Sequence, residues 1–219
     1  TALMPSTSPD LLAFAREAGR QSVRIAQMEN MKPTDIVTMD SFENAILVHA
    51  AISGSTNAML HLPAIAHEFG IEITGETFDR LHRNARYLLD VRPAGRWPAE
   101  CFYYAGGVPA IMEAIKEHLH LDVMTVTGKT LGENLEELKQ NGFYEKCNKW
   151  LQEFNKRYNV NLTKEDIIRP YDKAIGTDGS IALLKGNLAP EGAVIKHTAC
   201  PKEMFKSILR ARPFDSEEE

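Results

Sequence analysis

The sequence predicts a helix-rich α/β protein whose final part changes to β structure. In several segments of residues 1–165, apolar residues recur at intervals of three and four, the spacing of helices with one buried face. After Pro170 the pattern changes to two short runs rich in apolar and β-branched residues, separated by a turn that contains Gly and Pro. We therefore predict two parts, residues 1–165 and residues 166–219.

The first predicted helix begins at Pro9 and runs to about Asn30. Ser8 is a good N-cap, Pro9 suits the first helical position, and Asp10 complements the positive end of the helix dipole. The predicted apolar face is formed by residues four and three apart, namely Leu11, Ala15, Ala18, Ser22 and Ile25. Pro33 marks the break that follows.

A second helix is predicted after the cap Asp40, and it ends in a small polar cluster. The cluster reads Ser53-Gly54-Ser55-Thr56-Asn57 and interrupts an otherwise apolar region. Residues 58–69 are predicted to be helical again, with Gly70 as the C-cap. The expected arrangement is therefore a helix, a polar break and a second helix.

The remaining elements follow from shorter patterns. Helices are predicted over residues 76–84 after the cap Thr74, over 108–119, over 131–139, and over the amphipathic, charge-alternating segment 141–164. Strands are predicted over residues 87–91, 123–126, 180–185 and 193–198. The last two are joined by the turn 186–192, so we expect them to pair.

Composition limits the class of protein. The chain has 219 residues, 43% of them hydrophobic and 25% charged, which is typical of a globular protein. The net charge is −5, so no excess of Lys and Arg favours nucleic-acid binding. Three scattered cysteines suit a reducing compartment, and neither a secretory leader nor a membrane-spanning run is visible, so we expect a cytoplasmic protein. Both ends suggest a segment of a longer protein.

Several motifs have a plain structural explanation. Gly128-Lys129-Thr130 resembles part of a phosphate-binding loop, but the glycine that this loop needs five residues earlier is replaced by Val123. We predict an ordinary turn into a helix, with nucleotide binding as a weaker alternative. Tyr103 and Tyr104 are predicted to pack in the core.

The histidines and cysteines do not form a metal-ligand pattern. His61 and His67 are six residues apart, which places them on different faces of a helix, and His118 and His120 are not aligned either. His197 and Cys200 form half of a possible metal site that nothing nearby completes. We therefore expect core or surface histidines, and no metal ligand is predicted in this chain.

The cluster Ser53–Asn57 is the best local candidate for a binding site. Small residues let the backbone approach a ligand closely, and free N–H groups at a helix start attract a carboxylate or phosphate. The alternative is an N-cap with close helix packing. Both interpretations remain open on the residues alone.

Several segments resemble the dihydroxy-acid/phosphogluconate dehydratase family. The central match is Ser53-Gly54-Ser55-Thr56-Asn57-Ala58 followed by residues 60–67, which is similar to the family's GGSTN…LHLPAIAHE segment. Further matches follow in family order at residues 8–11, 104–107, 125–131, 168–170 and 186–194. Collinear motifs along nearly the whole chain carry the resemblance.

The resemblance implies a fold and a reaction. Members have an N-terminal α/β domain and a C-terminal β-barrel domain, so residues 1–165 would be helical parts of the first and residues 166–219 the opening strands of the barrel. Members are hydro-lyases that convert a 2,3-dihydroxy carboxylic acid, such as a branched-chain dihydroxy acid or an aldonic acid, to a 2-oxo-3-deoxy acid. An iron–sulfur cluster and Mg²⁺ are the implied cofactors. For the full-length protein the resemblance implies a homo-oligomer, either a dimer or a tetramer. It also implies a small hydroxy-acid substrate, and it implies neither nucleic acid nor membrane as a partner.

The resemblance assigns few residues. The family's cluster cysteines and its Cys-Asp-Lys metal motif precede the matched region, and its catalytic serine and a further metal-binding glutamate follow it, so no catalytic residue and no metal ligand is transferred. Ser55, Thr56 and Asn57 transfer as substrate-binding residues. Ser53 replaces the first glycine of the motif. Residues 102–107 are more similar to the sugar-acid (pentonate) branch. The competing hypothesis is a non-catalytic fragment or helical interaction module that lacks the metal sites.

Overall fold

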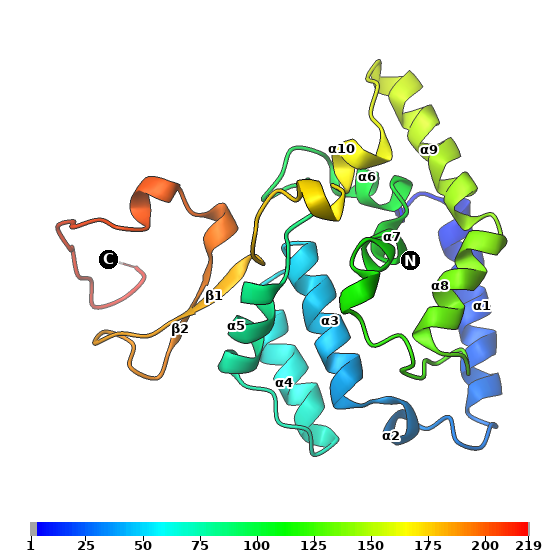
Figure 1. Ribbon diagram of the computed structural model, residues 1–219, viewed down its shortest axis with the longest axis horizontal. Helices are drawn as coiled ribbons and strands as arrows, with labels where there is room; N and C mark the ends of the chain where they lie inside the picture. Colours follow the sequence, from blue (N-terminus) through cyan, green and yellow to red (C-terminus); the bar gives the residue numbers. More distant parts are fainter. Residues whose placement is uncertain (1–3, 219) are drawn as a thin grey trace.

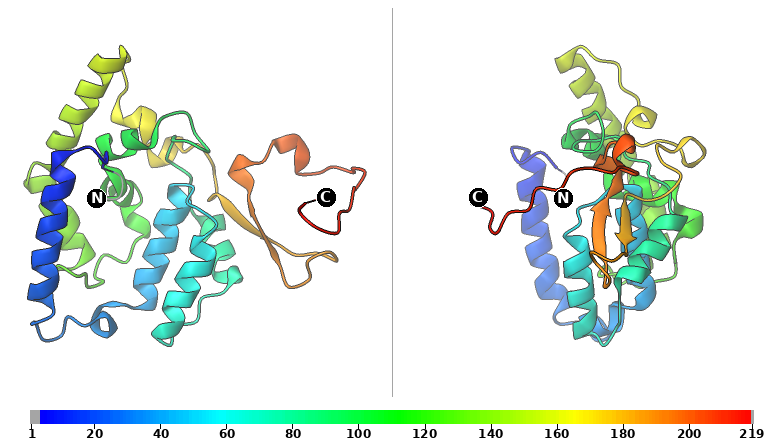
Figure 2. Two further views of the ribbon diagram at one scale, coloured as in Figure 1. Left: turned by 180° about the vertical axis from the view of Figure 1, so that it is seen from behind. Right: turned by 90° about the vertical axis from the view of Figure 1, so that its left-hand side faces the viewer.

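The computed structural model describes residues 4–218 as a helical body with a two-stranded hairpin at one side (Figures 1 and 2). The helices are α1 (Pro9–Ile25), α2 (Pro33–Ile36), α3 (Met39–Ala51), α4 (Ala58–Glu68), α5 (Gly75–Asn84), α6 (Ala99–Tyr104), α7 (Gly107–Ala114), α8 (Leu131–Gln140), α9 (Phe143–Tyr158) and α10 (Lys164–Ile167). The strands are β1 (Ile181–Leu184) and β2 (Ala193–Lys196). The predicted helix-rich α/β class is confirmed. None of the described helices is long and apolar enough to cross a membrane.

Helix α1 starts where the sequence predicts but ends early. Ser8 is in the extended conformation and Pro9 is the first helical residue. The helix stops at Ile25 rather than near Asn30, because residues 26–30 form turns and Asn30 has a left-handed backbone with φ +59°. No residue of α1 is buried, so its apolar face lies at the edge of the core.

Helix α3 is the central element of the body. Its cap is Thr38 rather than the predicted Asp40: the Thr38 hydroxyl accepts from the Ser41 amide at 3.2 Å, and Ser41 Oγ accepts from the Thr38 amide at 3.0 Å. Ile46, Ala50 and Ala51 on α3 are fully buried. Other large side chains of the core are Phe78, Leu88, Ile111, Leu135 and Ile167.

Two predicted strands are wrong. Residues 87–91 are extended and mostly buried, but they form only isolated bridges to Gly176, Ile168 and Trp97. The amides of Leu88 and Leu89 donate instead to the Ala51 carbonyl at the end of α3, and no strand within residues 4–218 pairs along this segment. Residues 123–126 likewise form a single bridge, from Met124 to Thr130.

The predicted helices between residues 108 and 164 occur with changed boundaries. Helix α7 ends at Ala114 and a short 3-10 turn, Lys116–His118, follows it. Helix α9 ends at Tyr158, because the next residue, Asn159, has a left-handed backbone (φ +51°), and α10 begins after Thr163. The short helices α2, α6 and α10 have no counterpart in the sequence prediction.

The predicted hairpin is confirmed. Strands β1 and β2 pair antiparallel, with Ile181 opposite Lys196 and Leu184 opposite Ala193. Strand β1 packs on α5, where the Asp79 carboxylate accepts from the Leu183 amide at 2.9 Å. This contact places the hairpin beside the end of α3, and the segment after residue 200 is exposed (Figure 1).

Candidate functional site

The candidate site is the break between α3 and α4, built from residues 53–57. Helix α3 ends in a Schellman motif, in which the Gly54 amide donates to the His49 carbonyl at 3.0 Å and the Ser53 amide to the Ala50 carbonyl at 3.3 Å. Ser53 occupies the left-handed position of the motif, with φ +54°. This position favours glycine, which accounts for the glycine that the resembled segment carries there.

Gly54 lies directly against the ring of His49. A Cβ atom on Gly54 would be 2.1 Å from His49 Cδ2, which is far inside van der Waals contact. The glycine is therefore required for the packing of His49 beneath the chain. This finding supports the close-packing interpretation for Gly54 itself.

His49 belongs to a chain of hydrogen bonds that joins the break to strand β1. The Ile181 amide donates to His82 Nδ1 at 3.2 Å, so His82 carries its proton on Nε2 when neutral. His82 Nε2 is 3.2 Å from His49 Nδ1, which must then accept, and His49 Nε2 donates to the Ser55 carbonyl at 2.8 Å. The two backbone groups at the ends thus fix both tautomers.

Burial keeps both rings neutral. His82 is 1% exposed and His49 is 8% exposed. Desolvation lowers the pKa of His82 to about 3, with the charges of His49 and His197 adding to the effect. Desolvation also lowers the pKa of His49, against a smaller opposing effect of its bond to the Ser55 carbonyl. The chain of bonds is therefore complete at neutral pH.

The second strand of the hairpin also holds the break. The Lys196 ammonium donates to the Ser53 carbonyl at 2.7 Å and to the Gly54 carbonyl at 3.2 Å, and burial lowers its pKa. The hydroxyls of Ser53 and Thr198 are 3.0 Å apart. No carboxylate within residues 4–218 pairs with Lys196, so its charge adds to the positive end of α4.

The predicted residues Ser55, Thr56 and Asn57 lie exposed at the start of α4. The Ser55 hydroxyl accepts from the Asn57 amide at 3.3 Å, whereas the Thr56 hydroxyl and the Asn57 side chain make no hydrogen bond to the described residues. The backbone N–H groups of Ser55 and Thr56 have no acceptor there either. The first amides of α4, those of Ala58, Met59 and Leu60, already donate to the carbonyls of residues 55–57, so the free donors lie in the turn just before the helix. Such donors beside an ammonium that has no carboxylate partner among the described residues are suited to a carboxylate or a polyhydroxylated ligand.

One prediction tests the role of Lys196. We expect Lys196→Met to lower the free energy of unfolding by about 1–2 kcal/mol, because two backbone carbonyls lose a charged donor. The matched control is Lys185→Met, which removes an exposed lysine that pairs with the exposed Glu76 and should change stability by no more than about 0.5 kcal/mol. Urea unfolding measures the free energy of unfolding of both variants and of the parent chain. Equal effects would show that Lys196 does not hold the break.

The alternative motifs have structural roles. Thr130 caps α8 by accepting from the Glu133 amide at 3.2 Å, and Lys129 pairs with Glu137 at 2.7 Å. These bonds support the prediction of an ordinary turn and not the alternative of a phosphate-binding loop. Tyr103 and Tyr104 are buried and in edge-to-face contact with ring centroids 6.2 Å apart, as predicted for packing residues.

The two histidines of α4 lie at the surface. His61 and His67 are exposed, and His197 lies 3.8 Å from Asp178 without contact to the Cys200 thiol, which donates to the Pro201 carbonyl. Within residues 4–218, one group has a spacing that could hold a metal, and it consists of Asp40, Glu43 and His120. Glu43 is already bound to Arg80 at 2.8 Å and to His120 at 3.1 Å, so both of its carboxylate oxygens have protein partners.

Comparison with known proteins places this fold in a family. The family model described as "Dihydroxy-acid/6-phosphogluconate dehydratase N-terminal" matches residues 1–134, and the corresponding C-terminal model matches residues 166–219. The chain belongs to the dihydroxy-acid/6-phosphogluconate dehydratase family. The resemblance noted from the motifs is thereby confirmed, and the break at residues 53–57 lies inside the N-terminal match of this dehydratase family.

Curated members of the dehydratase family are similar over almost the whole chain. The dihydroxy-acid dehydratase of Methanosarcina barkeri is 43% identical over 206 residues, which are 94% of this chain and 34% of the relative. That of Caldicellulosiruptor bescii is 38% identical over 218 residues, 99% of this chain and 35% of the relative. The chain thus spans about a third of the length of these dehydratases.

The cysteines described here do not fit the iron–sulfur cluster that the dehydratase family implies. Cys101 and Cys147 are buried, and desolvation raises the pKa of each thiol to about 11, so both stay protonated. Cys200 does not join them in a group of ligands. The Asp40–Glu43–His120 group does not fit Mg²⁺, because Arg80 binds one oxygen of Glu43 and His120 binds the other, which leaves Asp40 as the one oxygen ligand of the group without a partner among the described residues. We therefore derive no reaction step through either cofactor.

The sequence analysis did not identify three residues that hold the break, namely His49, His82 and Lys196. One feature of the sequence could have pointed to His49, since it interrupts the longest apolar stretch, residues 45–52. No feature of the sequence pointed to His82 or Lys196, because their roles depend on contacts among β1, β2 and α3.

Proposed function

We propose that the complete gene product containing this chain is a hydro-lyase that converts a 2,3-dihydroxy carboxylic acid to a 2-oxo acid, and that residues 55–57 bind the substrate. The observation that carries the proposal is the set of unpartnered donors of residues 55–57, in the turn before α4, held beside Lys196 in a chain of this family. These donors bind and orient an anionic, hydroxylated ligand without supplying a base.

The substrate class follows from the relatives. Curated members are named dihydroxy-acid dehydratases, which favours a dihydroxy acid, such as the branched-chain type that the motif resemblance implies. An aldonic acid is the second candidate, because residues 102–107 resemble the pentonate branch. We further propose a cytoplasmic homo-oligomer whose iron–sulfur cluster and Mg²⁺ are held by residues other than those described here.

The test is turnover by the complete gene product, purified without oxygen and supplied with iron, sulfide and Mg²⁺. We expect a 2-oxo acid to form from the dihydroxy acid, with an aldonic acid assayed in parallel to separate the two substrate classes. Absence of turnover of either acid by a protein that carries its cluster would contradict the proposal and favour the non-catalytic module.

Substitution at the break provides a second prediction. We expect Thr56→Val to raise KM for the dihydroxy acid about tenfold, since one donor to the bound substrate is lost at nearly constant volume. Thr34→Val, an exposed threonine on α2, is the matched control and should leave KM unchanged. Steady-state kinetics gives the KM of both variants and of the parent protein. An unchanged KM for Thr56→Val would remove Thr56 from the substrate site.

A further inference from the structure

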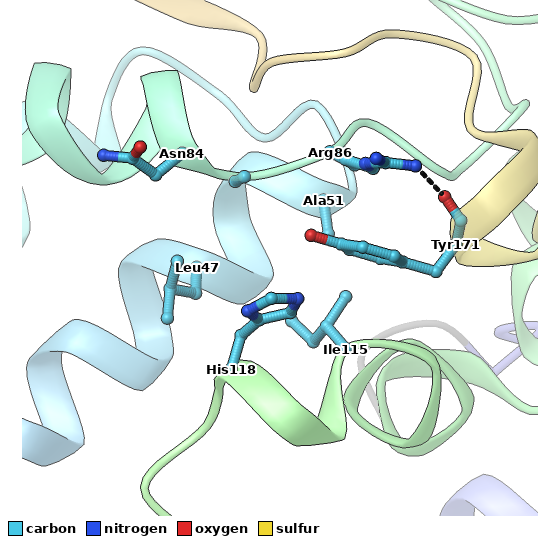
Figure 3. A pocket seen from close by; sticks show the side chains of 8 residues that line it. Leu47, Ala51, Asn84, Arg86, Ile115, His118 and Tyr171 are labelled. Atoms are coloured by element: carbon cyan, nitrogen blue, oxygen red, sulfur yellow. Dashed lines mark hydrogen bonds between the residues drawn. The ribbon is translucent and has the colours of Figure 1, made fainter.

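A separate cavity of about 160 Å³ lies between α3, the end of α5, the turn after α7 and residue 171 (Figure 3). Its floor is apolar and consists of Leu47, Ala51, Ala85 and Ile115. Its polar lining consists of Asn84, Arg86, His118 and Tyr171. No Asp or Glu lines it, so the charge of the cavity is positive. Residues 53–57 are not part of this lining.

The polar wall is built around the ring of Tyr171. The Arg86 guanidinium lies over one face at 4.6 Å from the ring centroid, and the His118 ring lies on the other side with centroids 4.9 Å apart (Figure 3). Arg86 also donates to the Tyr171 backbone carbonyl at 2.8 Å. These contacts fix the direction of the guanidinium and of the phenol before any ligand arrives.

Arg86 is a partly buried cation without a counter-ion. No carboxylate within residues 4–218 forms an ion pair with it, and the hydroxyl of Tyr171 and the ring nitrogens of His118 make no hydrogen bond there. A guanidinium removed from water favours an anionic partner, and its remaining N–H groups match the two oxygens of a carboxylate.

We propose that this cavity binds a small aliphatic monocarboxylate. The carboxylate pairs with Arg86 and accepts from Tyr171 Oη, and the aliphatic part lies on Leu47, Ala51 and Ile115. The volume of about 160 Å³ guides the choice of probe, because an engineered apolar cavity of about 150 Å³ holds benzene, which has six non-hydrogen atoms. 2-Methylpropanoate has this size and shape and is the probe that we choose.

The test is isothermal titration of the complete gene product that contains this chain with 2-methylpropanoate and with its neutral isostere 2-methylpropanamide. We expect saturable binding of the carboxylate with a Kd of about 1 mM, and binding of the amide at least about tenfold weaker. This comparison needs no variant, so it stands even if a substitution disturbs folding. Equal binding of acid and amide, or no binding of either, would overturn the proposal.

Variants locate the binding. Arg86→Gln is expected to weaken carboxylate binding about tenfold or more, and Tyr171→Phe is expected to weaken it about threefold. Arg86→Lys keeps the positive charge and is expected to weaken binding less than Arg86→Gln does. Arg83→Gln, an exposed arginine on α5 outside the cavity, is the matched control. Thr56→Val should leave binding unchanged, which separates this cavity from the proposed substrate site. Loss of binding in Thr56→Val with Arg86→Gln unaffected would assign the ligand to residues 53–57 instead.

Discussion

Gly54→Ala is expected to lower the free energy of unfolding by about 3 kcal/mol, because the new methyl group would overlap the His49 ring. The Cβ position is 2.1 Å from His49 Cδ2 and 2.5 Å from His49 Nε2. His49 cannot move aside without losing its bonds to His82 and to the Ser55 carbonyl. Chemical denaturation followed by circular dichroism measures the change.

The matched control for this variant is Gly19→Ala. Gly19 lies within α1, and no atom would lie within 4 Å of a Cβ there. Alanine is the better helix former by about 0.5–1 kcal/mol, so this variant should be slightly more stable than the parent chain. If both variants were equally stable, the close contact between Gly54 and His49 would be absent from the folded protein.

The second large effect is a loss of stability in mild acid. Both His49 and His82 have a folded-state pKa below the usual value, so the unfolded chain binds more protons as the pH falls. The contribution of these two histidines to stability is therefore constant above about pH 6.5 and falls below it, by about 1.4 kcal/mol per pH unit for each histidine that stays neutral when folded. Between about pH 6.5 and 5 the carboxylates contribute little, since their model-peptide pKa values lie lower.

The measurement is the unfolding free energy across this pH range for the parent chain and two variants. His82→Gln is expected to be less stable at pH 7 and to have a shallower slope by about one proton, because the residue that resists protonation is gone. His61→Gln changes an exposed histidine on α4 and should keep the parent slope. A parent chain whose stability does not change between about pH 6.5 and 5 would contradict the buried neutral pair.

Local signals in the sequence predicted most helices and the hairpin. Pro9 and Gly70 mark helix ends through their backbone preferences and Thr74 through its side-chain cap, and the turn at residues 186–192 joins the paired strands β1 and β2. Residues 87–91 have the composition of a strand but lie against the end of α3. No local pattern indicates which backbone groups a buried extended segment will meet.

The candidate site was only partly predictable for the same reason. The small polar residues 53–57 stand out in an apolar region, and the family resemblance assigns the last three to the substrate. What holds them in place comes from far along the chain: His82 lies 33 residues after His49, and Lys196 lies 143 residues after Ser53. Such contacts are set by tertiary packing, and neither residue has a distinctive local pattern.

The central claim is that residues 55–57 receive the anionic end of a hydroxy acid at a break held by His49 and Lys196. The most direct measurement is a crystal structure of the complete gene product with a bound dihydroxy acid or its 2-oxo product. We predict a carboxylate or hydroxyl oxygen about 3 Å from the free donors of Ser55, Thr56 or Asn57. A ligand bound elsewhere, with these three residues covered by protein or open to solvent, would contradict the account.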